Sequence, residues 1–367
     1  MPTKRKLWPM DGHTAGKHLV LRVYLNAWFG ILSNRFDQLL FVDGFAGPGE
    51  YKTGEDGSPL VALKAVIEHT HSKVQSTKIR YIFIDCDKAR LEHLQAKVFA
   101  EIDDIPPNIR IDFFCETFEK ATDKHIIPAQ EGLLGNPCFI MIDPFGVNQT
   151  PLNAITKIMS FPRTEVYISL MYEFINRFKK QPEFESSLNM LFGCTDWQKH
   201  SQIDDKEARK KELYKLYKNK LKESCAKQVV HFDLYNGNKL KYGVFFATQN
   251  ILGSQKIKEA IWKVVPKGDF AFRSENNPQL NINIEKPNFE PLQEILISYL
   301  KDRGFVSIKE ILEYIDSDST EFHRGHVKAN GLKVIENKGE LAVSVKRTLN
   351  KPRRALTYPD DCLIMIE

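Results

Sequence analysis

The sequence lacks the marks of membrane, secreted and metal-bound proteins. It has no stretch of about 18 apolar residues, which a membrane-spanning helix would need. Residues 1–10 are basic and carry no apolar core of a signal peptide. The six cysteines are scattered, and no two of them form a C-x-x-C pair. We therefore expect free thiols in a cytoplasmic protein, with neither a disulfide nor a metal site.

The composition is that of a soluble globular chain with room for two domains. The 367 residues are 42% hydrophobic and 27% charged, with a formal net charge of +5. This small basic excess permits nucleic-acid binding without establishing it. The sequence has no internal repeat and no low-complexity tract.

Short apolar segments alternate with helical segments through the first half of the chain. The candidate strands are residues 39–42, 79–84, 109–114, 138–142 and 164–170. The candidate helices are residues 16–32, 59–71 with Ser58 as cap, 89–100, 118–125 and 152–159. Near-continuous apolar strands joined by helices predict a parallel, doubly wound α/β sheet.

The region after the fifth strand has a different pattern. Residues 172–227 are helical and rich in lysine, which predicts an insertion. Candidate strands at 229–234 and 242–248 flank the turn signal Asn236-Gly237-Asn238 and predict a late antiparallel hairpin. A helix at 254–265 is expected on the sheet or between the hairpin strands. Together these elements predict a Rossmann-like class I methyltransferase sheet over residues 1–272.

The last part of the chain predicts a second domain. Residues 273–290 are rich in Asn and Pro, which indicates a linker. Residues 291–367 then contain helices at 292–302, 308–315 (capped by Ser307) and 320–330, and strand candidates at 333–337 and 341–345. Three helices followed by a hairpin is the order of a winged helix-turn-helix domain.

The turn after the first strand is the clearest chemical motif. A phosphate-binding P-loop would need Lys and Ser/Thr after the last glycine, but Glu50 and Tyr51 stand there, and the spacing also fails GxGxxG. An acid without a phosphate-binding cation suits S-adenosylmethionine (SAM), with Asp43 holding its ammonium and the glycines admitting the ligand. A plain βα turn is the alternative. The candidate residues are Asp43, Gly44, Phe45, Ala46, Gly47, Pro48 and Gly49.

Further cofactor candidates follow the second and third strands. Asp85 ends the second strand, where an acid can accept both ribose hydroxyls, and Asp87 is its neighbour. Glu116 and Thr117 follow the third strand and can lie against the adenine ring. Asp87 and Thr117 can equally be helix caps.

The loop after the fourth strand suggests a methyl acceptor. Amino-methylating enzymes carry a D/N/S-P-P-aromatic tetrapeptide here, whose first side chain and a backbone carbonyl hold the target amine. This chain has Asp143, Pro144, Phe145 and Gly146, so it keeps the amine-holding part and lacks the aromatic residue at the last position. A polar strand end with a proline turn is the alternative.

Two more candidates, Tyr172 and Glu173, follow the fifth strand at the same edge of the sheet. Both can contact a substrate, or they can simply begin a helix.

Lysine-rich and arginine-rich segments suggest a nucleic-acid surface. Residues 206–227 form a solvated helix face or, with the interleaved Tyr214 and Tyr217, a surface for phosphates and bases. The C-terminal domain offers Arg324, His326, Lys328, Lys346, Arg347, Lys351, Arg353 and Arg354.

These motifs as a set resemble the three-Cys-motif partner protein family. The likeness covers residues 10–265 and rests on the segments 41–51, 57–59, 142–146, 162–165 and 171–173, while the tail resembles the winged helix-turn-helix domain that some members carry. The family is bacterial and archaeal and methyltransferase-like. The resemblance implies SAM as cofactor and, as partner, a radical-SAM protein with three clustered cysteines.

The sequence thus leaves two functions open. In the first, the chain is a SAM-dependent methyltransferase that acts on DNA or RNA at a base amine, with Asp143 and the Pro144 carbonyl orienting that amine. In the second, the chain is a non-catalytic or degenerate SAM-binding accessory subunit that recruits the radical-SAM partner to DNA or RNA.

Overall fold

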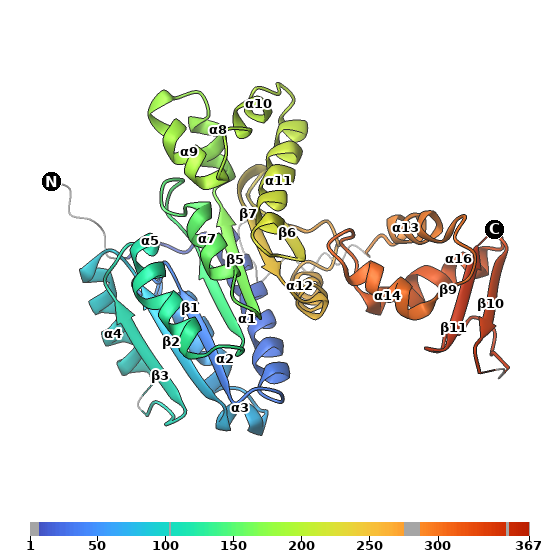
Figure 1. Ribbon diagram of the computed structural model, residues 1–367, viewed down its shortest axis with the longest axis horizontal. Helices are drawn as coiled ribbons and strands as arrows, with labels where there is room; N and C mark the ends of the chain where they lie inside the picture. The colour runs from blue at the N-terminus through green and yellow to red at the C-terminus, as the bar shows by residue number, and fades with distance from the viewer. Residues whose placement is uncertain (1–6, 103, 275–286, 350–351, 367) are drawn as a thin grey trace. The chain divides into compact units, whose positions relative to one another are not determined.

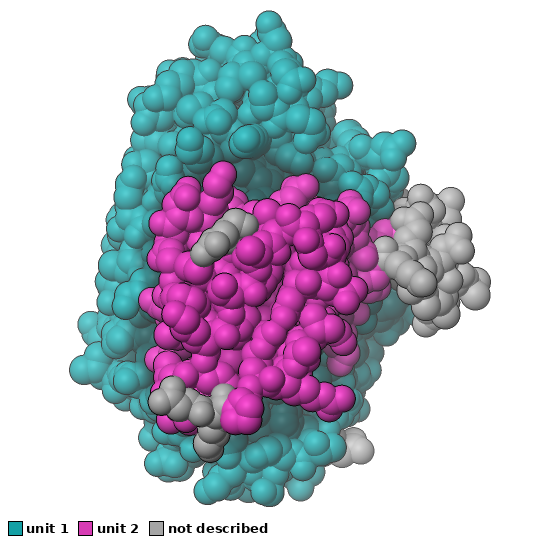
Figure 2. Space-filling model, turned by 90° about the vertical axis from the view of Figure 1, so that its right-hand side faces the viewer, with its two compact units in different colours: residues 1–250, 271–281 teal, residues 251–270, 282–367 magenta. Residues whose placement is uncertain are grey.

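A computed structural model describes residues 7–102, 104–274, 287–349 and 352–366. The chain divides into two compact units, residues 1–250 with 271–281, and residues 251–270 with 282–367 (Figure 2). Within the described ranges, no helix is both long enough and apolar enough to cross a membrane.

The first unit is built on one eight-stranded sheet with the order β3-β2-β1-β4-β5-β7-β6-β8 (Figure 1). Strands β1 to β5 pair in parallel, and β7 runs antiparallel to both β5 and β6. This is the Rossmann-like sheet with a late antiparallel hairpin that the sequence predicts. The strands are β1 (Gln38–Asp43), β2 (Lys78–Ile84), β3 (Ile109–Phe114), β4 (Cys138–Ile142), β5 (Thr164–Leu170), β6 (Gln228–Asn236), β7 (Lys239–Thr248) and β8 (Ala271–Ser274).

Helices cover both faces of this sheet. On one face, Tyr24 and Trp28 of α1 pack against Phe139 of β4. On the other face, Ile155 and Ile158 of α7 belong to a core that also includes the strand side chains pointing away from α1. The helices of this unit are α1 (Gly12–Leu32), α2 (Ser58–Ile67), α3 (Ser72–Ser76), α4 (Lys88–Glu101), α5 (Phe118–Ala121), the π turn η1 (Thr122–Ile126), α6 (Ile127–Gly132), α7 (Leu152–Met159), α8 (Tyr172–Phe178), the 3₁₀ turn η2 (Pro182–Phe184), α9 (Glu185–Phe192), α10 (Trp197–Ser201) and α11 (Lys206–Glu223).

Three details of the first unit differ from the sequence-based expectation. Gly57, and not Ser58, is the N-cap of α2, because the Ser58 hydroxyl is bonded to Asp43 instead. The predicted linker begins within β8, which pairs in parallel with β6, and residues 275–286 of it lie outside the described residues. Tyr214 and Tyr217 are 4% and 0% exposed, so their expected contact with bases is wrong: they pack into the core under α11.

The second unit combines helices with a three-stranded antiparallel sheet of order β10-β11-β9. The expected strand at 333–337 is wrong, because Val327, Leu332 and Ile335 are buried at helical spacing. The elements are α12 (Ile251–Val264), α13 (Glu290–Leu300), β9 (Val306–Ser307), α14 (Ile308–Asp316), α15 (Arg324–His326), the π turn η3 (Val327–Leu332), α16 (Lys333–Lys338), β10 (Val343–Arg347) and β11 (Cys362–Ile366).

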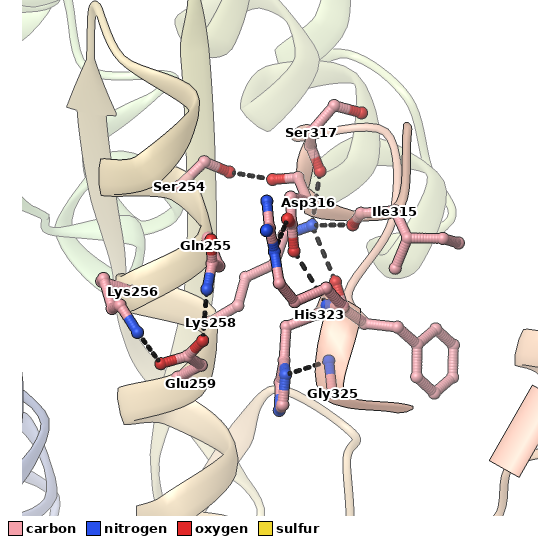
Figure 3. Close-up of polar contacts among 12 residues, drawn as sticks. Ser254, Gln255, Lys256, Lys258, Glu259, Ile315, Asp316, Ser317, His323 and Gly325 are labelled. Atoms are coloured by element: carbon pink, nitrogen blue, oxygen red, sulfur yellow. Dashed lines mark hydrogen bonds and ion pairs between the residues drawn. The ribbon is translucent and has the colours of Figure 1, made fainter. Parts of the chain in front are cut away.

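A buried lysine explains why α12 groups with the second unit (Figure 3). Lys258 is fully buried, and its ammonium donates to the carbonyl oxygens of Ile315 (2.7 Å), Ser317 and Phe322 (2.9 Å). These oxygens lie at the end of α14 and in the loop after it. Because α12 follows β7 in the chain, the expected place of this helix between the hairpin strands is wrong.

Candidate active site

A cavity of ≈ 270 Å³ brings the glycine turn and the loop after β4 together. The two segments meet because β1 and β4 are neighbours in the sheet and end at the same edge. The lining residues are Trp8, Thr14, Lys17, Phe45, Ala46, Gly47, Pro48, Gly49, Glu50, Tyr51, Gly57, Ser58, Asp143, Pro144, Phe145, Met171, Phe174 and Tyr242.

Asp43 lies beneath the turn, and it is not among the described residues that line the cavity. Its carboxylate accepts the Phe45 backbone N–H (3.1 Å) and the Ser58 hydroxyl (2.6 Å). Complete burial raises the pKa of Asp43 to about 7, although these two hydrogen bonds oppose the rise. Asp43 therefore stabilises the turn through these two hydrogen bonds.

The glycines of the turn serve different purposes. Gly47 and Gly49 have φ of +60° and +82°, a region that L side chains rarely adopt. A Cβ on Gly49 would lie 2.4 Å from Leu94 of α4, so this position is closed by packing. A Cβ on Gly47 would meet only Trp8, at 4.0 Å, so the space beside Gly47 opens into the cavity. Gly47 is thus the position where a ligand can approach the backbone.

Asp85 braces the turn from the neighbouring strand. Its buried carboxylate accepts the backbone N–H of Gly47 (3.0 Å) and of Asp87 (2.7 Å), and it pairs with the Arg90 guanidinium through Nε (3.1 Å) and Nη2 (2.7 Å). Asp87 caps α4 through the N–H groups of Ala89 and Arg90. Ribose hydroxyls at Asp85 would have to replace Arg90.

Glu116 and Thr117 have partners of their own after β3. Glu116 forms an ion pair with Lys124 (2.6 Å). The Thr117 hydroxyl accepts the Lys120 N–H at 3.5 Å and caps α5. Thr117 thus has the capping role of the alternative interpretation, and Glu116 is engaged in an ion pair.

Asp143 forms an ion pair with Lys17, a residue of α1 that lies 126 positions away in the chain. Burial opposes ionisation of Asp143, but the charge and hydrogen bond of Lys17 outweigh it and lower the pKa of Asp143 below its usual value. The ammonium of Lys17 also lies 5.8 Å from the centre of the Tyr242 ring. The cavity therefore contains a carboxylate and an ammonium in direct contact.

Phe145 lines the cavity, although the tetrapeptide motif has a proline at its position. Its side chain is 44% exposed, and its ring meets Trp8 edge-on with centroids 5.3 Å apart. The Arg90 guanidinium lies 5.3 Å from the same ring. An aromatic face is thus present beside Asp143 even though Gly146 stands at the aromatic position of the tetrapeptide.

Tyr172 and Glu173 begin α8 and are not among the described lining residues. The Tyr172 ring packs edge-on against Tyr214, with centroids 5.7 Å apart. Glu173 forms ion pairs with Lys241 (2.6 Å) and Lys239. Their neighbours Met171 and Phe174 face the cavity instead.

The sequence analysis missed Lys17, Trp8 and Tyr242 as site residues. One signal was available for Lys17. It shares the buried face of α1 with Val20, Leu21 and Tyr24, at spacings of three, four and seven residues. A lysine on the apolar face of a helix needs a buried partner, and here that partner is Asp143.

The expected basic surface of the second unit is largely neutralised within the unit. Arg347 pairs with Asp361 (2.6 Å), Lys328 with Asp360 (2.9 Å), and Arg353 with Glu336. Arg324 pairs with the buried Asp316 (2.6 Å). Lys351 lies outside the described residues.

The residues around the cavity fit SAM. Gly47 leaves room for a ligand, and the aromatic side chains offer the ring faces that attract a sulfonium cation. Among the described residues, no group of three or more His, Cys, Asp or Glu side chains is arranged to hold a metal ion.

Solved structures that are similar to part of this chain include several methyltransferases. The chain resembles magnesium protoporphyrin IX methyltransferase from Synechocystis PCC 6803 with bound SAM, at 9% identity and a TM-score of 0.33, over 66% of this chain and 85% of that one. It also resembles the methyltransferase domain of bacterial CtHen1-C, at 11% identity and a TM-score of 0.31, over 62% and 98% of the two chains. A human methyltransferase 10 domain containing protein matches at 11% identity and a TM-score of 0.32, over 63% and 83%.

No protein-family model matches the sequence. A search of curated proteins finds no significant relative.

Proposed function

We propose that this protein is a SAM-dependent methyltransferase that acts on nucleic acid at a base amine. The observation that carries the proposal is the shared cavity, in which the glycine turn and the Asp143-Pro144-Phe145 loop face the same space. A methyl donor and a methyl acceptor must meet in one site, because transfer in line requires both reacting atoms within a few ångströms.

The chain's own residues would position the two reactants. The backbone at Gly47 and the aromatic walls would hold SAM, which supplies an activated methyl group when bound. Asp143, kept ionised by Lys17, would accept an N–H of the amine and fix its lone pair toward the donor. Trp8 and Phe145 would stack on the base, and stacking tolerates any base because each has a π face.

The second unit supports a role in binding the polymer or a partner. A winged helix in this unit is supported by its order of α13, β9, α14, the helical run α15–η3–α16, and then β10 and β11. The internal ion pairs of its arginines leave fewer cations for phosphates. This favours the partner, which the family resemblance suggests is a radical-SAM protein with three clustered cysteines.

The second candidate function is a SAM-binding accessory subunit for that partner. It is favoured by one observation: Asp143 already has an internal cation, Lys17, where a substrate amine would have to bind. In this case the cavity would bind SAM, and methyl transfer would not follow.

Transfer of tritium from methyl-labelled SAM to DNA and RNA, with and without the partner protein, separates the two candidates. Methylation requires label in the polymer, which Asp143→Ala abolishes while SAM affinity measured by calorimetry stays within a few-fold. Asp123→Ala is the matched control, since Asp123 lies outside the cavity lining and pairs with Lys157 at the surface. Absence of label under all conditions, together with intact SAM binding, would favour the accessory subunit. Absence of SAM binding would refute both.

A further inference from the structure

The ion pair between Lys17 and Asp143 has hydrogen-bonding capacity left over inside the cavity. Lys17 has three N–H donors and Asp143 two acceptor oxygens, and their contact uses one of each. Both residues line the cavity, and their side chains are 4% and 24% exposed. Among the described residues, the Lys17 ammonium has no other hydrogen-bond acceptor. A ligand in the cavity therefore meets a donor and an acceptor side by side.

This arrangement discriminates between kinds of amine. A protonated aliphatic amine would bring a second cation next to Lys17, and like charges in a buried site repel strongly. A neutral heteroaromatic amine of the amidine type has an N–H donor on its exocyclic nitrogen and a lone pair on the adjacent ring nitrogen. Its two adjacent atoms match the carboxylate and the ammonium, in the same way that paired side-chain groups read base edges.

The walls of the cavity suit the same kind of molecule. The Trp8 ring contacts the rings of Tyr51 and Phe145, with centroid distances of 6.5 Å and 5.3 Å. Tyr242 also lines the cavity, with its ring centre 5.8 Å from the Lys17 ammonium. Aromatic faces bind flat heteroaromatic rings by stacking.

We propose that Lys17 is a specificity-determining residue that donates to the ring nitrogen beside the target amine, while Asp143 accepts from the amine itself. The proposal rests on the proposed function, since it assumes a base amine as methyl acceptor. It names the substrate class: an amine next to a ring nitrogen, as in adenine and cytosine, and not the ammonium of a lysine or polyamine.

Deaza nucleosides test the proposal by removing the ring nitrogen and leaving the amine. Binding of adenosine, 1-deazaadenosine, 7-deazaadenosine, cytidine and 3-deazacytidine is measured by calorimetry or ligand-observed NMR, with S-adenosylhomocysteine present. The wild type is expected to bind cytidine about tenfold or more tightly than 3-deazacytidine, since a hydrogen bond to a charged donor is lost. 1-Deazaadenosine is expected to show a similar loss, whereas 7-deazaadenosine keeps the ring nitrogen of the amidine unit and should bind as adenosine does.

The Lys17→Met variant should erase this preference. In the variant the parent nucleosides and their deaza analogues are expected to bind equally, within about twofold, which a merely structural lysine would not produce. Because Lys17→Met leaves Asp143 unpaired, the double variant Lys17→Met/Asp143→Asn provides a neutral site if the single variant does not fold. Asn keeps an acceptor oxygen for the amine, so the double variant should also bind without preference.

Several outcomes overturn the proposal. It fails if the wild type shows no deaza preference, if no nucleoside binds up to its solubility, or if the preference survives in the Lys17 variants. It also fails if Lys17→Met weakens S-adenosylhomocysteine binding and leaves the deaza preference unchanged, because Lys17 would then belong to the cofactor.

Methyl transfer from tritiated SAM to single-stranded DNA and RNA is measured in parallel. Transfer without deaza preference refutes the role of Lys17 and leaves the methyltransferase intact. Deaza preference without transfer supports the role of Lys17 and refutes catalysis.

Discussion

Asp43 is a single residue whose burial ties stability to pH. Its pKa is raised to about 7 in the folded chain by burial, against 3.8 for the ordinary group. The folded state therefore keeps a proton that the unfolded state releases near pH 4, and the stability from this residue is present below pH 4 and lost as the pH rises to 7.

We predict that Asp43→Asn removes this dependence. Asn can accept the Phe45 N–H and donate to the Ser58 hydroxyl, so the turn should persist. The difference in unfolding free energy, wild type minus variant, should fall between pH 4.5 and 7 with a slope of at most about 1.4 kcal/mol per pH unit. Urea unfolding across this range measures it. The opposite slope, or a flat difference, would mean that Asp43 is ionised when buried.

A second prediction at the residue scale concerns Gly47. Gly47→Val should abolish SAM binding, because its side chain would fill the space beside the turn, where the nearest atom is 4.0 Å away. Gly54→Val is the matched control: Gly54 also has positive φ (+92°) but does not line the cavity. Both variants should lose about 1–2 kcal/mol through backbone strain, and calorimetry should show lost SAM binding for Gly47 alone. Equal SAM affinity in the two variants would place the ligand elsewhere.

The sequence predicts the parts of the site whose position depends only on the order of neighbouring elements in the chain. The glycine turn and the segment 143–146 each follow an apolar strand directly, so their place at the sheet edge follows from order alone. Lys17, Trp8 and Arg90 enter through tertiary contacts with partners 126, 137 and 55 positions away, as pairs with Asp143, Phe145 and Phe145. No local sequence pattern indicates which residues will meet across such separations in the chain.

At the scale of elements, prediction succeeded where the pattern was unambiguous. β3, β4, α7 and β5 have the predicted bounds, because apolar runs ended at clear turn residues. Residues 333–337 were misread as a strand because Val334 and Ile335 are β-branched, and tertiary packing of Ile335 overrode that preference. β11 was missed, since its pairing with β9 joins residues more than fifty positions apart.

A prediction at the scale of elements concerns Lys258 of α12, in the second unit (Figure 3). Lys258→Met should destabilise this unit by about 3 kcal/mol or more, because it leaves the carbonyls of Ile315, Ser317 and Phe322 buried without their donor. Lys256→Met is the control: Lys256 is partly exposed and pairs with Glu259 on the same helix, so about 0.5 kcal/mol is expected.

Hydrogen exchange of the full chain, followed by mass spectrometry of α14 peptides, measures the difference. Protection should fall about a hundredfold for Lys258→Met and only slightly for Lys256→Met. Similar protection in both variants would show that the buried ammonium contributes little.

At the scale of the whole molecule, the chain changes unit more than once. It passes from the first unit to α12, returns to β8 beside β6, and then continues into α13. A cut at the polar segment 273–290, where composition places the boundary, therefore separates α12 from the elements on which it packs. Contact between Trp262 and the rings of Phe289, Phe322 and His326 would be lost along with the Lys258 hydrogen bonds.

We therefore predict different behaviour for two C-terminal fragments, of which the longer one includes β8 of the first unit. Residues 251–367 should fold cooperatively, whereas residues 291–367 should be molten or aggregate, because Phe322 and the carbonyls around Lys258 lose their cover. Thermal melts by circular dichroism and amide dispersion in NMR spectra distinguish the two. A matched third fragment, 251–367 with Trp262→Ala and Lys258→Met, should resemble the shorter one. If residues 291–367 melt cooperatively at the same temperature as the longer fragment, α12 is dispensable for folding. The domain boundary predicted from the composition would then be correct.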